Sequence, residues 1–247
     1  MRRLLRWGAP ALLVVAAGAA VPWLLPRMPG FEVARVEVSG TRLLAPHVVL
    51  AASGVQAGHS VWADPGEWEA ALLRNAVIER VEIRRRLPHT LRIRVVEKQP
   101  TALVDAGALR PATGAGELLP VDPALASVDL PLLHLRSETG SGAEVRDPGD
   151  RAALAELHRL SQLDPLLLAG VSEVRGGEEG ELLLSVAEPS AEIRLPFGAD
   201  KARLGQLRAA LDVLARQSAG ASAAPPAPLI VDLRFRDQIV VRLPSRT

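Results

Sequence analysis

The run from Val77 to Pro100, VIERVEIRRRLPHTLRIRVVEKQP, decides the fold of the first half of the chain. Apolar residues occupy every second position of segments 81–83 and 91–95, and charged residues lie between them. A period of two places the apolar side chains on one face of a β-strand. The residues at 86–89 (RLPH) interrupt both patterns and indicate a turn. The run therefore predicts two successive half-buried strands joined by that turn.

The residues before this run complete a small module. Phe31–Ser39 alternates and predicts a strand, and Pro46–Ser53 predicts a short helix that ends at Gly54 as its C-cap. Asp64-Pro65 predicts the start of a second helix, because aspartate caps helices and proline favours the first turn. The order strand, helix, helix, strand, strand over residues 31–99 predicts one α/β module.

Residues 100–247 predict a second domain, so that the whole exported part belongs to the α+β class. Its helices are expected to start at Asp147-Pro148 and at Asp200, and residues 218–228 form an Ala/Pro/Ser linker. Strands are expected at Ala102–Val104, Glu117–Val121, Leu132–Leu135, Val171–Val174, Glu181–Val186, Ala191–Leu195, Leu229–Phe235 and Ile239–Leu243. A mostly antiparallel sheet with two helices packed on it is the expected arrangement.

The amino terminus predicts the topology. The uncharged run 7–25 would span roughly 28 Å as a helix, close to a bilayer core of about 30 Å. Three arginines within residues 1–6 precede it and only Arg27 follows closely, which predicts a short cytoplasmic tail, a transmembrane helix and an extracytoplasmic remainder. The small residues at 17–19 leave a cleaved signal peptide as the alternative, although the apolar run continues beyond that point.

Composition excludes several classes of function. The formal net charge of +1 gives no support to nucleic-acid binding, and the lack of cysteine excludes disulfides and thiolate metal sites. The five histidines are scattered, without the spacing of a zinc site, and no phosphate-binding glycine loop occurs. The triplet at 84–86 (RRR) is interpreted as a solvated strand segment rather than as a lipid or nucleic-acid patch, because only Arg84 and Arg86 share a face and Glu82 and Glu97 are near in sequence. No catalytic, cofactor or metal residues are predicted.

The ordered pattern of residues 77–100, with Leu-Pro-x-Thr-Leu before a strand that ends Glu-x-x-Pro, resembles a POTRA domain of the FtsQ type. The second half is similar to the β domain that follows this module in the FtsQ/DivIB family. Its matching pieces are Ile193–Gly198 and, above all, Val231–Phe235 (VDLRF). Ala76 departs from the proline common in the family, and Gln238 replaces a frequent turn glycine.

The resemblance implies a non-enzymatic cell division scaffold of the cytoplasmic membrane that acts in septum formation and recruits an FtsB/FtsL pair. Strand addition at the last, unpaired strand of the sheet would be the mode of binding. The positions that match family contacts are Phe235, Asp237, Gln238, Ile239, Val240 and Val241. For alternate members of 239–241, packing in the protein's own core is the competing interpretation. A POTRA-bearing transport or envelope-assembly component is the alternative function, although outer-membrane barrels need many more strands than the remaining residues can supply.

Overall fold

The computed structural model describes residues 30–126, 128–136, 142–178, 180–218, 228–235 and 238–242. They form two compact units that divide between Lys98 and Gln99. The predicted transmembrane segment 7–25 lies outside the described residues. Within the described part of the chain, no helix combines the length and apolar character needed to cross a bilayer.

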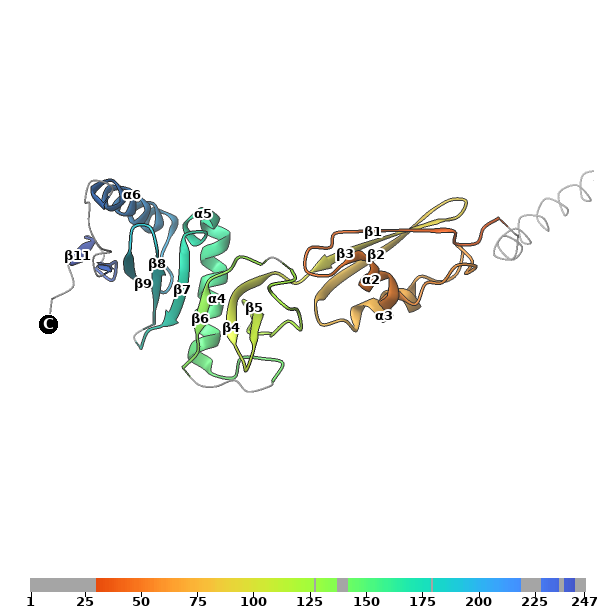
Figure 1. The fold of residues 1–247 in the computed structure, drawn as a ribbon, viewed down its shortest axis with the longest axis horizontal. Coiled ribbons are helices and arrows are strands. Elements are labelled where there is room, and N and C mark those ends of the chain that lie inside the picture. Colours follow the sequence, from red (N-terminus) through yellow and green to blue (C-terminus); the bar gives the residue numbers. More distant parts are fainter. Residues whose placement is uncertain are drawn as a thin grey trace, which may run out of the picture. The chain divides into compact units, whose positions relative to one another are not determined.

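The first unit is a three-stranded sheet with two helices on one face (Figure 1). Its elements are β1 (Arg35–Ser39), α2 (Pro46–Ser53), α3 (Gly66–Leu73), β2 (Ile78–Arg86) and β3 (Thr90–Glu97). The spatial order is β1-β3-β2, with β1 parallel and β2 antiparallel to the central β3. The order of elements predicted from the sequence is confirmed.

The ends of α2 and β1 in this unit are set by glycines. Gly54 caps α2 in the left-handed region at φ 70°, as predicted. Gly40 ends β1 at φ 88°, where a Cβ would lie 2.0 Å from the carbonyl oxygen of Val95, so no other residue fits there. The expected first strand was too long, because β1 starts only at Arg35. Helix α3 starts one residue later than expected, at Gly66, whose N–H donates to Asp64.

The carboxylate of Glu97, at the end of β3, fastens the loop after β1. It accepts hydrogen bonds from the backbone N–H groups of Arg42 (2.8 Å), Leu43 (2.7 Å) and Leu44 (3.0 Å). A carboxylate that takes three backbone donors satisfies groups that no strand or helix pairs. The glutamate of the Glu-x-x-Pro pattern therefore holds the crossover from β1 to α2.

The second unit is built on an eight-stranded sheet in the order β11-β10-β9-β8-β7-β6-β4-β5. Its elements are β4 (Pro100–Asp105), β5 (Leu109–Thr113), β6 (Leu132–His134), α4 (Pro148–Leu163), α5 (Pro165–Leu168), β7 (Val171–Gly176), β8 (Glu181–Val186), β9 (Ala191–Pro196), α6 (Lys201–Ser218), β10 (Leu229–Asp232) and β11 (Val240–Arg242). The two long helices, α4 and α6, start at the predicted caps, since Asp147 and Asp200 each accept a backbone N–H of the first turn.

The expected mostly antiparallel sheet holds only by a narrow majority, because the sheet is more mixed than the sequence indicated. Among the described strands, four neighbouring pairs are antiparallel and three, β10–β9, β7–β6 and β6–β4, are parallel. Helices α4 and α5 carry the chain from β6 to β7, and α6 carries it from β9 to β10. A helical crossover returns the chain in the same direction, so these connections produce parallel neighbours.

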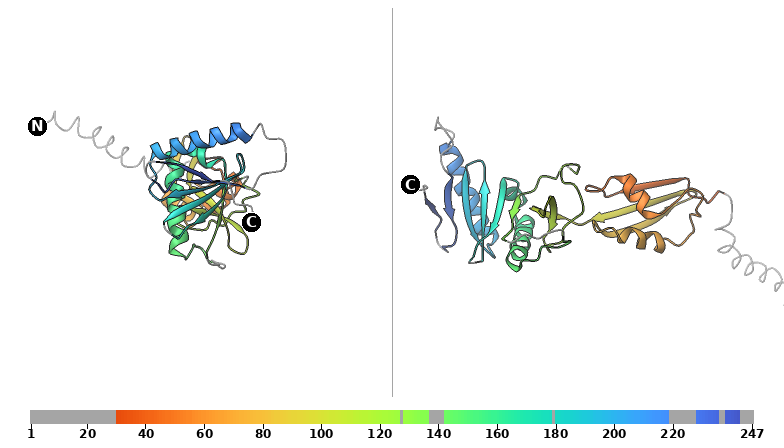
Figure 2. Two further views of the ribbon diagram at one scale, coloured as in Figure 1. Left: turned by 90° about the vertical axis from the view of Figure 1, so that its left-hand side faces the viewer. Right: turned by 60° about the horizontal axis from the view of Figure 1, so that its bottom comes forward.

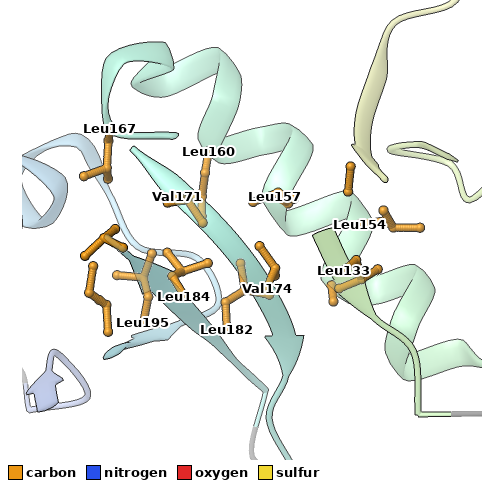
Figure 3. Close-up of a cluster of buried hydrophobic side chains, with 14 of the residues drawn as sticks. Leu133, Leu154, Leu157, Leu160, Leu167, Val171, Val174, Leu182, Leu184 and Leu195 are labelled. Atoms are coloured by element: carbon orange, nitrogen blue, oxygen red, sulfur yellow. The ribbon is translucent and has the colours of Figure 1, made fainter. Parts of the chain in front are cut away.

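The core of this unit lies between the sheet and the helices on one of its faces (Figure 2). Figure 3 shows Leu157 and Leu160 of α4 near side chains of β7 and Leu154 near Leu133 of β6, and all three helix leucines are fully buried. Their spacing of three residues keeps them on one stripe of the helix. Leu204 and Leu207 of α6 belong to the same core, which fixes α6 above the last strands.

Two elements escaped the sequence analysis and one expected strand is absent. Short strand β5 contains Pro111, and α5 is a single turn after Asp164, so neither has the length to show a period. Segment Glu117–Val121 is not a strand: it makes only isolated bridges, to Ala112 and Glu144. Leu118 and Leu119 are nevertheless buried, which explains the apolar pattern.

Candidate partner-binding edge

Strand β11 lies at one outer edge of the eight-stranded sheet. It pairs antiparallel with β10 through Ile230–Arg242, Val231–Val241 and Asp232–Val240, and β10 pairs parallel with β9. No described segment pairs with the outer side of β11. The last strand is therefore an edge strand, as the sequence led us to expect, with backbone groups available on that side.

The opposite edge, β5, differs from β11 because the chain itself covers it. Thr113 N–H donates to the carbonyl of Glu117, and Leu119 N–H donates to that of Pro111, both at 2.8–2.9 Å. Pro111 has no N–H to offer to another strand. The two edges of one sheet are thus unequal, and β11 is the one left open within the described residues.

Most of the side chains expected to contact a partner lie at this edge. Phe235, in the connection between β10 and β11, is 42% exposed, and Val241 of β11 is 44% exposed. Val240 is half-buried, and Ile239 is half-buried and packs on the core. The main chain of Gln238 is described and its side chain is exposed. Asp237 lies outside the described residues.

Arg203 of α6 holds the segment between β10 and β11, a role that the sequence analysis missed. Its guanidinium donates to the carbonyl of Leu233 (2.9 Å), to that of Gln238 (3.1 Å) and also to that of Phe235. A planar guanidinium offers five donors in a fixed fork, which suits several carbonyls at once. Its place three residues after the predicted helix cap, among other polar residues, gave no signal that it turns toward the strands.

Asp232 and Arg234 form a second fixed point beneath the same edge. The side chain of Arg234 donates from Nε to Asp232 Oδ1 (3.1 Å) and from Nη2 to Oδ2 (2.9 Å), and its backbone N–H donates to Oδ1 (3.0 Å). Glu181 of β8 lies 3.6 Å from Arg234. The hydrogen bond from Arg234 lowers the pKa of Asp232, which outweighs the opposing effect of burial. Asp232 is thus a buried, ionised and paired carboxylate that fixes the end of β10.

Comparison with known proteins shows which proteins this chain is similar to. Residues 31–98 match the family described as "POTRA domain, FtsQ-type". The chain is 26% identical to the cell division protein FtsQ of Geotalea daltonii, covering 95% of the chain and 85% of that relative. It is 29% identical to FtsQ of Anaeromyxobacter sp. (strain K), over 100% of the chain and 84% of that relative. FtsQ of Streptomyces collinus is 34% identical over 54% of the chain and 51% of its own length.

The chain is similar to the FtsQ proteins of the FtsQ/DivIB family over nearly its whole length. It is accordingly a cell division protein with a POTRA domain, and the resemblance inferred from residues 77–100 and 231–235 is confirmed. The Asp-Leu-Arg sequence at 232–234 has a physical explanation in this structure. Asp232 and Arg234 pair with each other, and Leu233 is buried in the core at 1% exposure.

Two other carboxylates, Asp150 and Glu156 of α4, have shifted pKa values and accept hydrogen bonds from neighbouring loops. Burial alone would raise the pKa of Glu156, but hydrogen bonds from Arg159 and from the N–H of Gly198 outweigh it and lower the pKa. Burial raises the pKa of Asp150, against the effect of the N–H of Arg136. Both side chains connect α4 to neighbouring loops. Among the described residues, no three His, Asp or Glu side chains are grouped so that they could hold a metal ion.

Proposed function

We propose that the chain is a non-enzymatic scaffold of the division machinery that binds an FtsB/FtsL-like pair by strand addition at β11. One observation carries the proposal: of the two edges of the main sheet, β5 is covered by residues 117–119, and β11 has no described neighbour on its outer side. An incoming strand would gain main-chain hydrogen bonds there. The exposed side chains of Phe235 and Val241 would supply apolar contact beside that ladder.

The internal supports of the edge fit this role. Strand addition needs a template that is already ordered, because ordering it on binding would reduce the affinity. Arg203 fixes the carbonyls of residues 233, 235 and 238, and the Asp232–Arg234 pair fixes the end of β10. These hydrogen bonds are made to residues that precede β11. The proposed binding edge consists of Phe235, Gln238, Ile239, Val240 and Val241, with Asp237 included by sequence, and Arg203 supports it from α6.

Anchoring is the second part of the proposal. Residues 7–25 would cross the cytoplasmic membrane once, with residues 1–6 in the cytoplasm and both compact units outside it. The apolar length of that run and the excess of arginine before it support this orientation. Alkaline extraction of membranes tests it, since an anchored chain stays in the pellet and a chain cleaved after residue 19 is released.

A matched pair of substitutions tests the edge. Val241→Lys places a charge on β11, and Leu109→Lys places the same charge on β5, where the side chain is 49% exposed. Capture of purified full-length chain by immobilised FtsB/FtsL-like partner should fall on the order of tenfold or more for the first variant and stay unchanged for the second. Circular dichroism checks that both variants fold.

Single proline substitutions separate backbone from side-chain effects. Along an edge strand, N–H groups point alternately inward and outward. Of Val240→Pro and Val241→Pro, one therefore removes an outward donor and should abolish capture while the fold stays intact. Capture that persists in both proline variants and in Val241→Lys, with folded protein throughout, would refute strand addition at β11.

A further inference from the structure

The face of the POTRA sheet opposite α2 and α3 gathers a strong positive charge. Cross-strand partners share a face, and the register of β1, β3 and β2 places Glu37 beside Arg92 and Arg92 beside Arg84. We call this surface the arginine face. Its charged members are Arg35, Glu37, Arg80, Glu82, Arg84, Arg86, Arg92 and Arg94. Six arginines against two glutamates leave four excess positive charges on one face of a chain whose net charge is only +1.

This charge is only partly neutralised within the described residues. Glu37 pairs with Arg92 (3.0 Å) and more distantly with Arg86 (3.5 Å), and Glu82 pairs with Arg84. Arg80 lies 3.7 Å from the neighbouring Glu79 in an exposed pair. Arg35 and Arg94 make no ion pair with any described residue. Residues Arg84 and Arg92 also stand directly opposite each other, and like charges in that position destabilise a sheet. Fold stability therefore does not explain the arrangement.

Arg85 shows the contrast. It points to the other side of β2, where it donates to the carbonyls of Val61 (2.8 Å) and Ala63 (3.1 Å) and lies over the ring of Trp62. Its guanidinium is used by the fold. The arginines of the arginine face extend into solvent instead, with side chains that are 73% exposed at Arg84 and 66% exposed at Arg86.

The chemistry of the arginine face favours a layer of phosphate groups over a protein partner. Protein interfaces depend on a few apolar or aromatic anchors, and the strands of this face contribute only Val96, 36% exposed, as a large apolar side chain. A hollow of about 630 Å³ lies on the face, lined by Glu37, Ser39, Gly40, Arg84, Arg92 and Arg94 together with two further strand residues. Arginine binds phosphate oxygens through two parallel N–H donors. Phosphate groups could approach each of the guanidinium groups.

We propose that the arginine face binds the anionic phospholipid headgroups of the membrane in which the chain is anchored. The inference rests on the proposed anchor at 7–25. Only nine residues separate that segment from Arg35, so an extended connection is at most roughly 35 Å long and keeps the face at high local concentration near the lipid. Binding would orient the POTRA domain against the bilayer. The interpretation of residues 84–86 as a plain solvated segment missed this surface, because four of its arginines come from outside that triplet, at positions 35, 80, 92 and 94.

The absence of cysteine from the chain makes a direct test simple. Ser39→Cys places one fluorophore on the arginine face, and Ala70→Cys places it on α3, on the other side of the domain. The full chain is reconstituted in vesicles that carry a nitroxide quencher on the lipid headgroup, with or without phosphatidylglycerol. We expect stronger quenching at position 39 than at 70 in phosphatidylglycerol vesicles, and no difference in phosphatidylcholine vesicles or at high salt.

Substitutions that break no ion pair complete the test. Arg35→Gln with Arg94→Gln should lower the docking equilibrium constant about fivefold per arginine, and Arg74→Gln on the helix side should not change it. Equal quenching at both positions, or quenching that survives the double substitution, would overturn the proposal. The proposal would also be overturned if the arginine face bound an added acidic polypeptide in vesicles without anionic lipid more strongly than it binds anionic lipid. A chain that fails to float with vesicles overturns the anchor as well, and partner capture at β11 is measured separately.

Discussion

Replacing Asp232 by Asn tests whether the ion pair beneath β10 stabilises the second unit. The substitution keeps the shape of the side chain and one oxygen for the backbone N–H of Arg234, which donates at 3.0 Å. It removes the charge and the second acceptor for the guanidinium. Asp232 is 3% exposed, so the loss occurs in a poorly hydrated position.

The magnitude follows from the geometry. Breaking a fully buried ion pair costs about 3–5 kcal/mol, and a hydrogen bond to a charged group contributes about 1.5–3 kcal/mol. The side chain of Arg234 is 33% exposed and keeps Glu181 at 3.6 Å, so it can be partly rehydrated and paired after the substitution. We therefore expect a loss of about 2 kcal/mol in the free energy of unfolding of this unit at neutral pH.

The effect should depend on pH in a defined direction. The pKa of Asp232 in the folded chain is lowered from its ordinary value of 3.8, so the folded state favours the ionised form. Its stabilisation is complete above pH 3.8 and is lost as the pH falls through the lower folded pKa. The difference between the original chain and Asp232→Asn should therefore be constant near neutrality and close only in acid.

The assay uses the distribution of tryptophan as an internal control. All four tryptophans precede residue 99, so tryptophan fluorescence follows the first part of the chain, whereas circular dichroism follows both units. In denaturant, Asp232→Asn should shift the dichroism transition of the second unit and leave the fluorescence of Trp62 and Trp68 unchanged. Asp212→Asn, at an exposed position of α6, is the matched control. A shift no larger than that of the control, or one that persists undiminished in acid, would refute the reasoning.

Two further predictions concern one loop and one core. Glu97→Gln should destabilise the POTRA domain by about 2 kcal/mol, because an amide cannot accept all three N–H donors of residues 42–44. Tryptophan fluorescence in urea measures this loss, and the exposed substitution Glu79→Gln is the control. Leu157→Ala should cost about 3 kcal/mol in the second unit because the side chain is fully buried, and an equal loss for Leu166→Ala, 76% exposed, would contradict that cause.

Local sequence predicted most of the elements because their determinants are local. Alternation over 81–83 and 91–95 identified β2 and β3, and Glu181–Val186 matched β8 residue for residue. The helix caps at Asp147 and Asp200 depend only on one side chain and the next turn of backbone, so these predictions were also confirmed. Segment 117–121 failed because burial of Leu118 and Leu119 gives an apolar pattern whether or not a strand forms.

The sequence by itself determined most of the strands and helices, since period and capping act within a few residues. The POTRA module and the β domain after it followed from the resemblance of residues 77–100 and 231–235 to a known family. Only the tertiary structure decided how those strands are ordered. It made three neighbouring pairs parallel, covered β5 while leaving β11 open, and brought six arginines from three strands onto one face. For the same reason, Arg203 donates hydrogen bonds to carbonyls that lie thirty or more residues later in the chain. Strand order and side-chain meetings of this kind depend on packing between distant segments, which a local pattern does not encode.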